Sequence, residues 1–403
     1  GLLHQCMVTP GFRCVALADH NLEKTVECAE ALDVPYRVVE TRRDMTVAIE
    51  QGDLAVCEDG ELAARCPPAD VFMDATGSIR AGGQLVLSAI EEGTHVAMAN
   101  AEADLIFGPY LSQQADEAGL TYTSIDGDQH GVLRRLVNDV VFWGFDLAMV
   151  GNMKGYLDRY ANPTSIIPEA DKRGFDYRMC TSFTDGTKLC VEMALAANDL
   201  GLTTATPGMH GPEADHVREV PDRFDLETIY EEHGPVVDYI LGAEPGGGVF
   251  VVGYCEEPYQ QDMMQTYKMG DGPFYTFHRP YHLCYVEALR SVAEGVLDGR
   301  SLLKHREGFQ TNVYAYAKKD LDAGTTLDGI GGYCCYGMIE NTSDQGDTPG
   351  VPICLIEDAE LTADVSKDEK ICADDVRIDP ERPDVQLYRK ARQETVSEPA
   401  VLA

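Results

Sequence analysis

Two lysines and two acidic residues in the middle of the chain have the types and spacing needed for proton transfer. Lys188 and Glu192 are four residues apart, so they share one face of a predicted helix that Asp185 introduces. Lys154, in the run Gly-Asn-Met-Lys-Gly-Tyr, is expected in a glycine-flanked loop that follows a strand. An ammonium group can protonate or polarise a carbonyl oxygen as it becomes an alkoxide. We take Lys188, Asp185, Lys154 and Glu192 as candidate catalytic residues; the alternative is an exposed ion pair of Lys188 and Glu192.

A second set of basic residues is suited to binding a carboxylate or phosphate. His278 and His282 are four residues apart, but Pro280 between them argues against a helix interior and so against a helical zinc site. A loop with His278, Arg279 and His282 beside Lys268 would bind an anionic group of a substrate. The alternative is a packed aromatic turn with hydrogen-bonded histidines. We predict no metal site.

The elements that must position these residues alternate in type along the first third of the chain. Short apolar runs typical of buried parallel strands alternate with segments of helical periodicity. The expected strands are 13–18, 69–76, 95–99 and 121–125, and the expected helices are 22–32, 83–92 and 108–118. Such βαβ units indicate an α/β protein with a Rossmann-type, doubly wound parallel sheet.

Ligands of such sheets bind outside the carboxyl ends of the strands. The residues at these ends are the candidate cofactor-binding residues: Asp19, Ala75, Thr76, Gly77, Asn100 and Glu102. A carboxylate at position 19 would accept hydrogen bonds from the adenosine ribose and repel a 2′-phosphate, which favours NAD over NADP. The alternative is that Asp19 only starts the turn into the next helix. A glycine-rich phosphate loop should precede this strand, and we expect that the given chain begins inside the domain.

The texture of the sequence changes twice after the first domain. We predict a dinucleotide-binding domain over 1–135, without its first strand and glycine-rich loop, and an α+β catalytic, substrate and dimerisation domain over 136–311. Short strands with turns predict a small β domain over 312–380, followed by a tail over 381–403. His210, in Gly-Met-His-Gly-Pro, is interpreted as a structural loop residue.

Several motifs, in order along nearly the whole chain, carry a family resemblance. They are Asp74-Ala-Thr-Gly77, Asn100-Ala-Glu-Ala-Asp104, Ser182-Phe-Thr-Asp-Gly-Thr-Lys188, Gly208-Met-His-Gly-Pro212, Lys268-Met-Gly-Asp-Gly-Pro273 and His278-Arg-Pro-Tyr-His282. The chain resembles homoserine dehydrogenase-like oxidoreductases that end in a SAF domain, and their 1-deoxy-D-xylulose 5-phosphate reductoisomerase-like subgroup. The segment from Lys318 to Tyr333 resembles the SAF module itself, a β-clip-like domain. Homoserine dehydrogenases have a lysine where Ala101 follows Asn100, which argues against homoserine as the substrate.

Charge and cysteine usage exclude several functional classes. The 68 acidic and 32 basic residues give a formal net charge of −36, which repels nucleic acids and anionic membrane surfaces. The 13 cysteines form no CxxC pair, as expected for reduced thiols in a cytosol. The apolar stretch 140–150 is too short to span a bilayer. We expect a soluble cytoplasmic homo-oligomer, a dimer through the middle domain, whose acidity indicates either a high-salt cytosol or simply an acidic protein.

Together these features predict an enzyme that uses NAD or NADP. The leading hypothesis is an oxidoreductase acting on a small polar carbonyl or alcohol, with a small-molecule substrate and no nucleic-acid or membrane partner. One alternative is a non-catalytic regulator that binds a dinucleotide or metabolite. The other is a lyase or dehydratase that uses the SAF domain.

Overall fold

The computed structural model describes residues 1–305 and 307–395, and these residues form two compact units. Unit 1 comprises residues 1–128, 283–304 and 387–394. Unit 2 comprises residues 129–282, 305, 307–386 and 395. The segment 283–304, which was predicted in the middle domain, therefore packs in unit 1, whereas the C-terminal strands pack in unit 2. The predicted domain boundaries themselves stay predictions.

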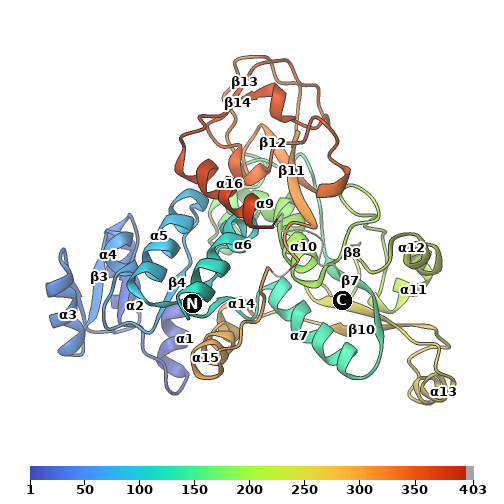
Figure 1. The fold of residues 1–403 in the computed structure, drawn as a ribbon, viewed down its shortest axis with the longest axis horizontal. Helices are drawn as coiled ribbons and strands as arrows, with labels where there is room; N and C mark the ends of the chain where they lie inside the picture. Colours follow the sequence, from blue (N-terminus) through green and yellow to red (C-terminus); the bar gives the residue numbers. More distant parts are fainter. Residues whose placement is uncertain (306, 396–403) are drawn as a thin grey trace. The chain divides into compact units, whose positions relative to one another are not determined.

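Unit 1 contains two three-stranded parallel sheets (Figure 1). The first has the order β1-β3-β2, with the bounds β1 (Ala16–Ala18), β2 (Tyr36–Val38) and β3 (Leu54–Cys57). Its helices are α2 (Leu22–Ala31), α3 (Arg42–Glu50) and α4 (Gly60–Ala64). The side chains of Asn21, Thr41 and Asp59 accept hydrogen bonds from backbone N–H groups at the starts of these helices, which fixes where each begins.

The second sheet has the order β4-β5-β6. Its strands are β4 (Val71–Asp74), β5 (His95–Met98) and β6 (Tyr122–Ser124). The helices of this part are α1 (Leu2–Val8), α5 (Ile79–Glu92), α6 (Ala101–Glu117), α14 (Cys284–Glu287), α15 (Leu289–Asp298) and α16 (Pro383–Thr395). Gly93 ends α5 in the left-handed conformation (φ 87°), as its position after the apolar pattern predicts. The segment predicted as a tail thus contains a helix.

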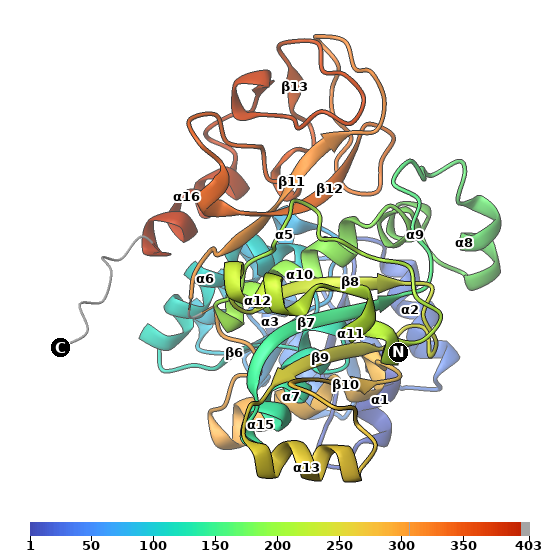
Figure 2. The ribbon, with the colours of Figure 1, turned by 90° about the vertical axis from the view of Figure 1, so that its right-hand side faces the viewer.

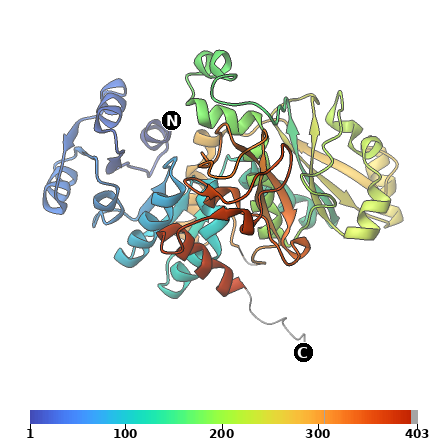
Figure 3. The ribbon, with the colours of Figure 1, turned by 90° about the horizontal axis from the view of Figure 1, so that it is seen from above.

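The predicted doubly wound parallel sheet is confirmed in part, because the described strands of unit 1 form two separate parallel sheets. The α/β alternation and the parallel pairing are confirmed, but β1 and β4 belong to different sheets, and no described strand lies between them. In Figure 3 the dark blue elements around β1–β3 lie apart from the lighter blue elements around β4 and β5. The sequence reasoning also missed β3, because its four residues are buried throughout and lack any alternation.

Unit 2 is built on a mixed four-stranded sheet of order β10-β9-β7-β8 (Figure 2). Its strands are β7 (Asp146–Lys154), β8 (Val236–Leu241), β9 (Val249–Tyr254) and β10 (Phe274–Arg279). Strands β7 and β8 are parallel, whereas β9 is antiparallel to both of its neighbours. The helices of this part are α7 (Gln129–Phe142), α8 (Ile167–Arg173), α9 (Tyr177–Thr184), α10 (Thr187–Leu200), α11 (Val220–Arg223), α12 (Leu226–His233) and α13 (Pro258–Thr266), with the short η1 (Val217–Glu219).

The C-terminal segment of unit 2 forms two small antiparallel sheets. One pairs β11 (Thr311–Ala317) with β12 (Cys335–Asn341), and the other pairs β13 (Glu360–Leu361) with β14 (Val376–Arg377). The short helices η2 (Thr342–Asp344), η3 (Ile353–Leu355) and η4 (Ala373–Asp375) lie in the connections. A small C-terminal β module is therefore present, while its assignment as a SAF domain stays a prediction.

Helix α10 joins the sheet of unit 2 to this C-terminal module. Twelve of its fourteen residues are buried, and it contacts α7, α9, β7, β8, β11 and β12. The buried Asn198 side chain accepts a hydrogen bond from Thr311 N at 2.9 Å and donates one to Thr311 O at 3.2 Å. This pair of bonds fixes β11 against the helix.

Replacing Asn198 with Ala should destabilise unit 2 strongly. Both backbone groups of Thr311 would lose their side-chain partner in a fully buried place, so we expect the free energy of unfolding to fall by about 2 kcal/mol. Urea unfolding measures this change. The control is Glu27→Ala on the exposed face of α2, which should change the free energy little. Equal stabilities of the two variants would contradict the role of Asn198.

None of the helices among the described residues is long and apolar enough to cross a membrane.

Candidate active site

The start of α10 carries the first of the predicted catalytic residues. Gly186 precedes the helix with a φ of 87°, a conformation that glycine adopts without strain, and it makes no side-chain cap. Asp185 takes over this role, since its Oδ1 accepts a hydrogen bond from Thr187 N at 2.9 Å. Asp185 is only 1% exposed. Burial raises the pKa of its carboxyl group, and the nearby Lys318 ammonium opposes that shift.

Lys188 and Glu192 form a mostly buried pair. The distance from Lys188 Nζ to Glu192 Oε1 is 4.0 Å, and the two side chains are 14% and 7% exposed. The interpretation as an ordinary exposed ion pair is therefore wrong, because α10 is covered on almost all sides. Charges in such a place interact more strongly than on the surface, because water screens them less.

Lys154 lies beside the same helix. It is the last residue of β7, not a loop residue as its glycine neighbours indicated, and its Nζ donates a hydrogen bond to Phe183 O at 2.5 Å. Burial lowers the pKa of the Lys154 ammonium, while the negative charges of Glu192 and Asp185 act in the opposite direction. The structure thus brings the predicted lysines and acids of strand β7 and helix α10 into one cluster.

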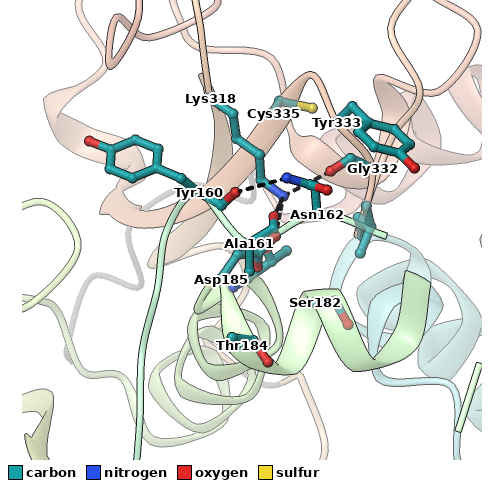
Figure 4. A network of polar contacts seen from close by, with 12 residues as sticks. Tyr160, Ala161, Asn162, Ser182, Thr184, Asp185, Lys318, Gly332, Tyr333 and Cys335 are labelled. Atoms are coloured by element: carbon teal, nitrogen blue, oxygen red, sulfur yellow. Dashed lines mark hydrogen bonds and ion pairs between the residues drawn. The ribbon is translucent and has the colours of Figure 1, made fainter. Parts of the chain in front are cut away.

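The sequence reasoning missed a third lysine in this cluster. Lys318 follows β11 directly, and its Nζ lies 2.8 Å from Asp185 Oδ2 (Figure 4). The same Nζ donates hydrogen bonds to Ala161 O at 2.6 Å and Gly332 O at 2.9 Å. Lys318 has an exposed lysine as its next neighbour, so nothing in the local sequence indicated which of the two is buried.

A small cavity of about 10 Å³, room for about one water molecule, adjoins Asp185. Arg159, Cys190, Tyr239 and Met338 are among the residues that line it. The Arg159 guanidinium contacts Met338 Sδ and lies 5.6 Å from the centre of the Tyr336 ring. A fixed positive charge therefore lines the same cavity as the Asp185 carboxylate.

In unit 1 the predicted cofactor residues lie at the carboxyl ends of β4 and β5. The buried Asn100 side chain donates hydrogen bonds to Asp74 Oδ2 at 3.2 Å, to Thr76 Oγ1 at 3.3 Å and to Ser78 O at 3.2 Å. Burial raises the pKa of Asp74. A Cβ atom on Gly82 would lie 2.2 Å from Asp74 Oδ2, so only glycine lets α5 approach this closely. Asn100 therefore fixes the loop after β4.

Other predicted cofactor residues remain accessible to a ligand. Ala75 and Gly77 are exposed, and a Cβ atom on Gly77 would meet nothing within 4 Å. Asp19 Oδ1 accepts a hydrogen bond from Asn21 N at 2.8 Å, so the turn role is real, but the side chain is still 38% exposed. Glu102 lies in the first turn of α6. A dinucleotide-binding site needs an accessible carboxylate at a strand end and exposed backbone at the start of a helix. Asp19 provides the first, and Ala75 and Gly77, before α5, provide the second.

The predicted substrate loop is not one loop. His278 and Arg279 end strand β10, whereas Lys268 precedes that strand, and six residues of strand span about 20 Å. The Arg279 guanidinium lies 4.8 Å from the centre of the Tyr281 ring. His282 Nδ1 is 2.7 Å from Gly247 O. The alternating Phe-Tyr-Thr-Phe run before His278 was the signal for the strand that the sequence reasoning did not use.

His210 is held in place by a buried carboxylate. Its Nδ1 lies 2.8 Å from Asp238 Oδ2, and Asp238 Oδ1 also accepts hydrogen bonds from Gly211 N at 3.0 Å and Tyr239 N at 2.8 Å. This geometry agrees with a structural role for His210, although its side chain is 41% exposed. Among the described residues, no group of three or more His, Cys, Asp or Glu could hold a metal ion.

His210 and His278 should titrate on opposite sides of the ordinary histidine value. The hydrogen bond to Asp238 favours the imidazolium and raises the pKa of His210. Burial, together with the positive charges of His216 and Arg218, lowers the pKa of His278. NMR titration of the ring protons, assigned with His210→Gln and His278→Gln variants, measures both values. A higher pKa for His278 than for His210 would show that these environments are wrong.

The comparison with protein families locates this cluster in a known type of domain. Residues 127–288 match the model described as Oxidoreductase DRL, catalytic domain. The matched range includes Lys154, Asp185, Lys188 and Glu192 but not Lys318. No curated protein matches the chain.

Solved structures show only distant similarity. A probable dehydrogenase from Thermotoga maritima is 11% identical, with a TM-score of 0.42 over 75% of this chain and 87% of that chain. Amine dehydrogenase from Mycobacterium smegmatis is 13% identical, with a TM-score of 0.35 over 70% and 91%. 1-deoxy-D-xylulose 5-phosphate reductoisomerase from Zymomonas mobilis, in complex with NADPH, is 18% identical, with a TM-score of 0.32 over 45% and 50%. The family match confirms the predicted class of enzyme: the chain is an oxidoreductase whose residues 127–288 match the DRL catalytic domain.

Proposed function

We propose that this oxidoreductase is NAD(P)-dependent and interconverts a small polar carbonyl compound and its alcohol. The observation that carries the proposal is the buried cluster of Lys154, Lys188, Asp185 and Glu192 inside the residues that match an oxidoreductase catalytic domain. Burying two ammonium groups and two carboxylates next to one another costs free energy, and such clusters are typical of sites where the charges take part in the reaction.

A bound nicotinamide would supply the hydride for reduction of the carbonyl carbon, or accept it in the reverse reaction. The residues of this chain transfer the proton. In reduction, the Lys154 ammonium donates a proton to the oxygen that gains negative charge, and in oxidation the neutral amine takes that proton back. Its lowered pKa makes the proton easier to release than from an ordinary lysine. Lys188 adds a second positive charge that stabilises the developing alkoxide.

The residues that would hold the dinucleotide belong to unit 1. Asp19 offers a carboxylate oxygen to the ribose hydroxyl groups, and the exposed backbone of Ala75 and Gly77 offers room at the start of α5. Glu102 is placed at the first turn of α6, near the end of β5.

The finer assignments rest on the family resemblance of the sequence. We propose homoserine dehydrogenase-like or 1-deoxy-D-xylulose 5-phosphate reductoisomerase-like chemistry, a C-terminal module of the SAF type, and a homo-oligomer in the cytoplasm. The substrate class is a small molecule with a polar group next to the carbonyl. Lys268, His278, Arg279 and His282 do not form one binding loop for it, so each would have to act separately.

Removing either lysine should abolish most of the turnover. Reduced nicotinamide is followed by its absorbance with a panel of hydroxy acids, amino alcohols and sugar phosphates, first for the unaltered protein. Loss of a charge that stabilises the transition state costs on the order of a hundredfold in rate, so we expect this loss in Lys154→Met and in Lys188→Met.

The matched control is Lys172→Met, which removes an exposed lysine from α8. Thermal unfolding of all variants separates lost chemistry from lost structure. Near-normal rates in both Lys154→Met and Lys188→Met would refute their proposed roles. Binding of cofactor without turnover on any compound of the panel would favour a dinucleotide-sensing regulator.

Asp19 should make the enzyme prefer NAD. Its carboxylate repels a 2′-phosphate, so we expect a lower KM for NAD than for NADP. Asp19→Asn keeps an oxygen for the bond from Asn21 N but removes the charge, and this variant should bind NADP better relative to NAD. Glu27→Gln, an exposed substitution of equal charge change on α2, should leave the ratio of the two KM values unchanged. A tenfold preference of the unaltered protein for NADP, about 1.4 kcal/mol, would overturn this assignment.

A further inference from the structure

The C-terminal module places one fully enclosed ammonium group against the candidate active site. The side chain of Lys318 is 3% exposed and that of Asp185 is 0% exposed. The Lys318 ammonium donates hydrogen bonds to Ala161 O at 2.6 Å and Gly332 O at 2.9 Å, and it forms an ion pair with Asp185, with Nζ 2.8 Å from Oδ2. Figure 4 shows the side chain reaching from the module to the residue before α10.

Burying such a charge is costly unless it is paired and hydrogen-bonded. Lys318 meets both conditions, since it makes two hydrogen bonds to backbone carbonyl groups and an ion pair with the carboxylate of Asp185, which caps the helix of the site. The next residue, Lys319, is also a lysine but is exposed, so this segment of the chain does reach the solvent. The burial of Lys318 is therefore a specific feature of how this module packs.

Lys318 also connects segments that surround the site. Its acceptor Ala161 belongs to a loop in which Asp158 N donates a hydrogen bond to Thr184 O at 2.8 Å, and Thr184 directly precedes Asp185. The module makes a second contact with this loop, because Asp368 accepts a hydrogen bond from Tyr160 Oη at 2.9 Å. The module thus holds this loop and the start of α10 in one arrangement.

We propose that Lys318 is a positioning residue of the candidate active site, which keeps Asp185 charged and thereby keeps Lys154 protonated. This inference rests on the proposed function and assigns the C-terminal module a part in it. Lys318 does not touch the reacting atoms. It acts through Asp185, whose negative charge favours the Lys154 ammonium.

Three other ionisable groups near Lys154 also affect its protonation. The negative charge of Glu192 and the Cys190 side chain favour its protonated form, and the positive charge of Arg173 disfavours it. None of these groups depends on the ion pair with Lys318. Without Lys318, only the hydrogen bonds with Thr187 oppose the effect of burial on Asp185, so the pKa of its carboxyl group rises further and its protonated form is favoured. Lys154 then loses one of the charges that keep it protonated, and its pKa falls further.

The experiment compares Lys318→Met with Lys319→Met, which removes the same charge one residue away at an exposed position. The rate of carbonyl reduction needs a protonated Lys154, so it declines as pH rises through the pKa of that lysine. In Lys318→Met we expect this alkaline decline to move to lower pH by about one unit, the usual effect of a nearby opposite charge. KM should change little. An unmoved decline in a folded Lys318→Met protein would overturn the proposal, even if its melting temperature falls.

A readout independent of turnover separates this inference from the proposed function. NMR of proteins with isotope-labelled lysine side chains follows the ionisation of Lys154, assigned with Lys154→Met. The titration of Lys154 should move to lower pH in Lys318→Met and stay in place in Lys319→Met. If no compound is turned over but the titration moves, the proposed function fails and the inference about Lys318 holds. If turnover is found and the titration does not move, the inference fails alone.

A second variant keeps the test decisive if Lys318→Met does not fold. Asp185→Asn removes the negative charge directly while keeping an oxygen for the bond from Thr187 N. The titration of Lys154 should then move in the same direction as in Lys318→Met. A Lys154 titration that is identical in Asp185→Asn and the unaltered protein would overturn the proposal.

Discussion

The burial of α10 on nearly every side is the constraint on which unit 2 depends. A helix that is apolar around its circumference cannot lie on the surface of a sheet and must be enclosed by other elements. Strands β7 and β8 cover one side of α10, and β11 and β12 cover another. Its enclosure therefore joins the four-stranded sheet and the C-terminal module into one unit. It also removes Glu192 and most of Lys188 from water.

The buried charges around α10 interact with one another more strongly than the acidic groups on the protein surface do. Exposed acids are screened by water and salt, and each contributes little to the structure. The buried groups of the site must instead compensate one another, Asp185 with Lys318 and Glu192 with Lys188. The negative charges of Glu192 and Asp185 favour the protonated form of Lys154, although burial disfavours it. The charge state of each group therefore depends on its neighbours, as acid–base chemistry requires.

In unit 1, side-chain hydrogen bonds hold the ends of the strands together. Asn100 draws the loop after β4 to the start of α6, and Asp104 accepts hydrogen bonds from Tyr122 Oη at 2.6 Å and Ser124 Oγ at 2.5 Å. These polar groups fix the carboxyl ends of β4, β5 and β6, while Ala75 and Gly77 remain exposed. A rigid base under an accessible loop is the arrangement expected where a ligand approaches backbone groups closely.

The sequence by itself determined those features that depend on local spacing. The alternation of strands and helices in unit 1, the helix that follows Asp185 and the pairing of Lys188 with Glu192 all follow from periodicities of a few residues. Only the tertiary structure decided that Lys318 meets Asp185, that His278 ends a strand distant from Lys268, and that β1 and β4 lie in separate sheets. Contacts between residues far apart in sequence are set by how whole elements pack to bury their apolar surfaces, and no local pattern records that packing.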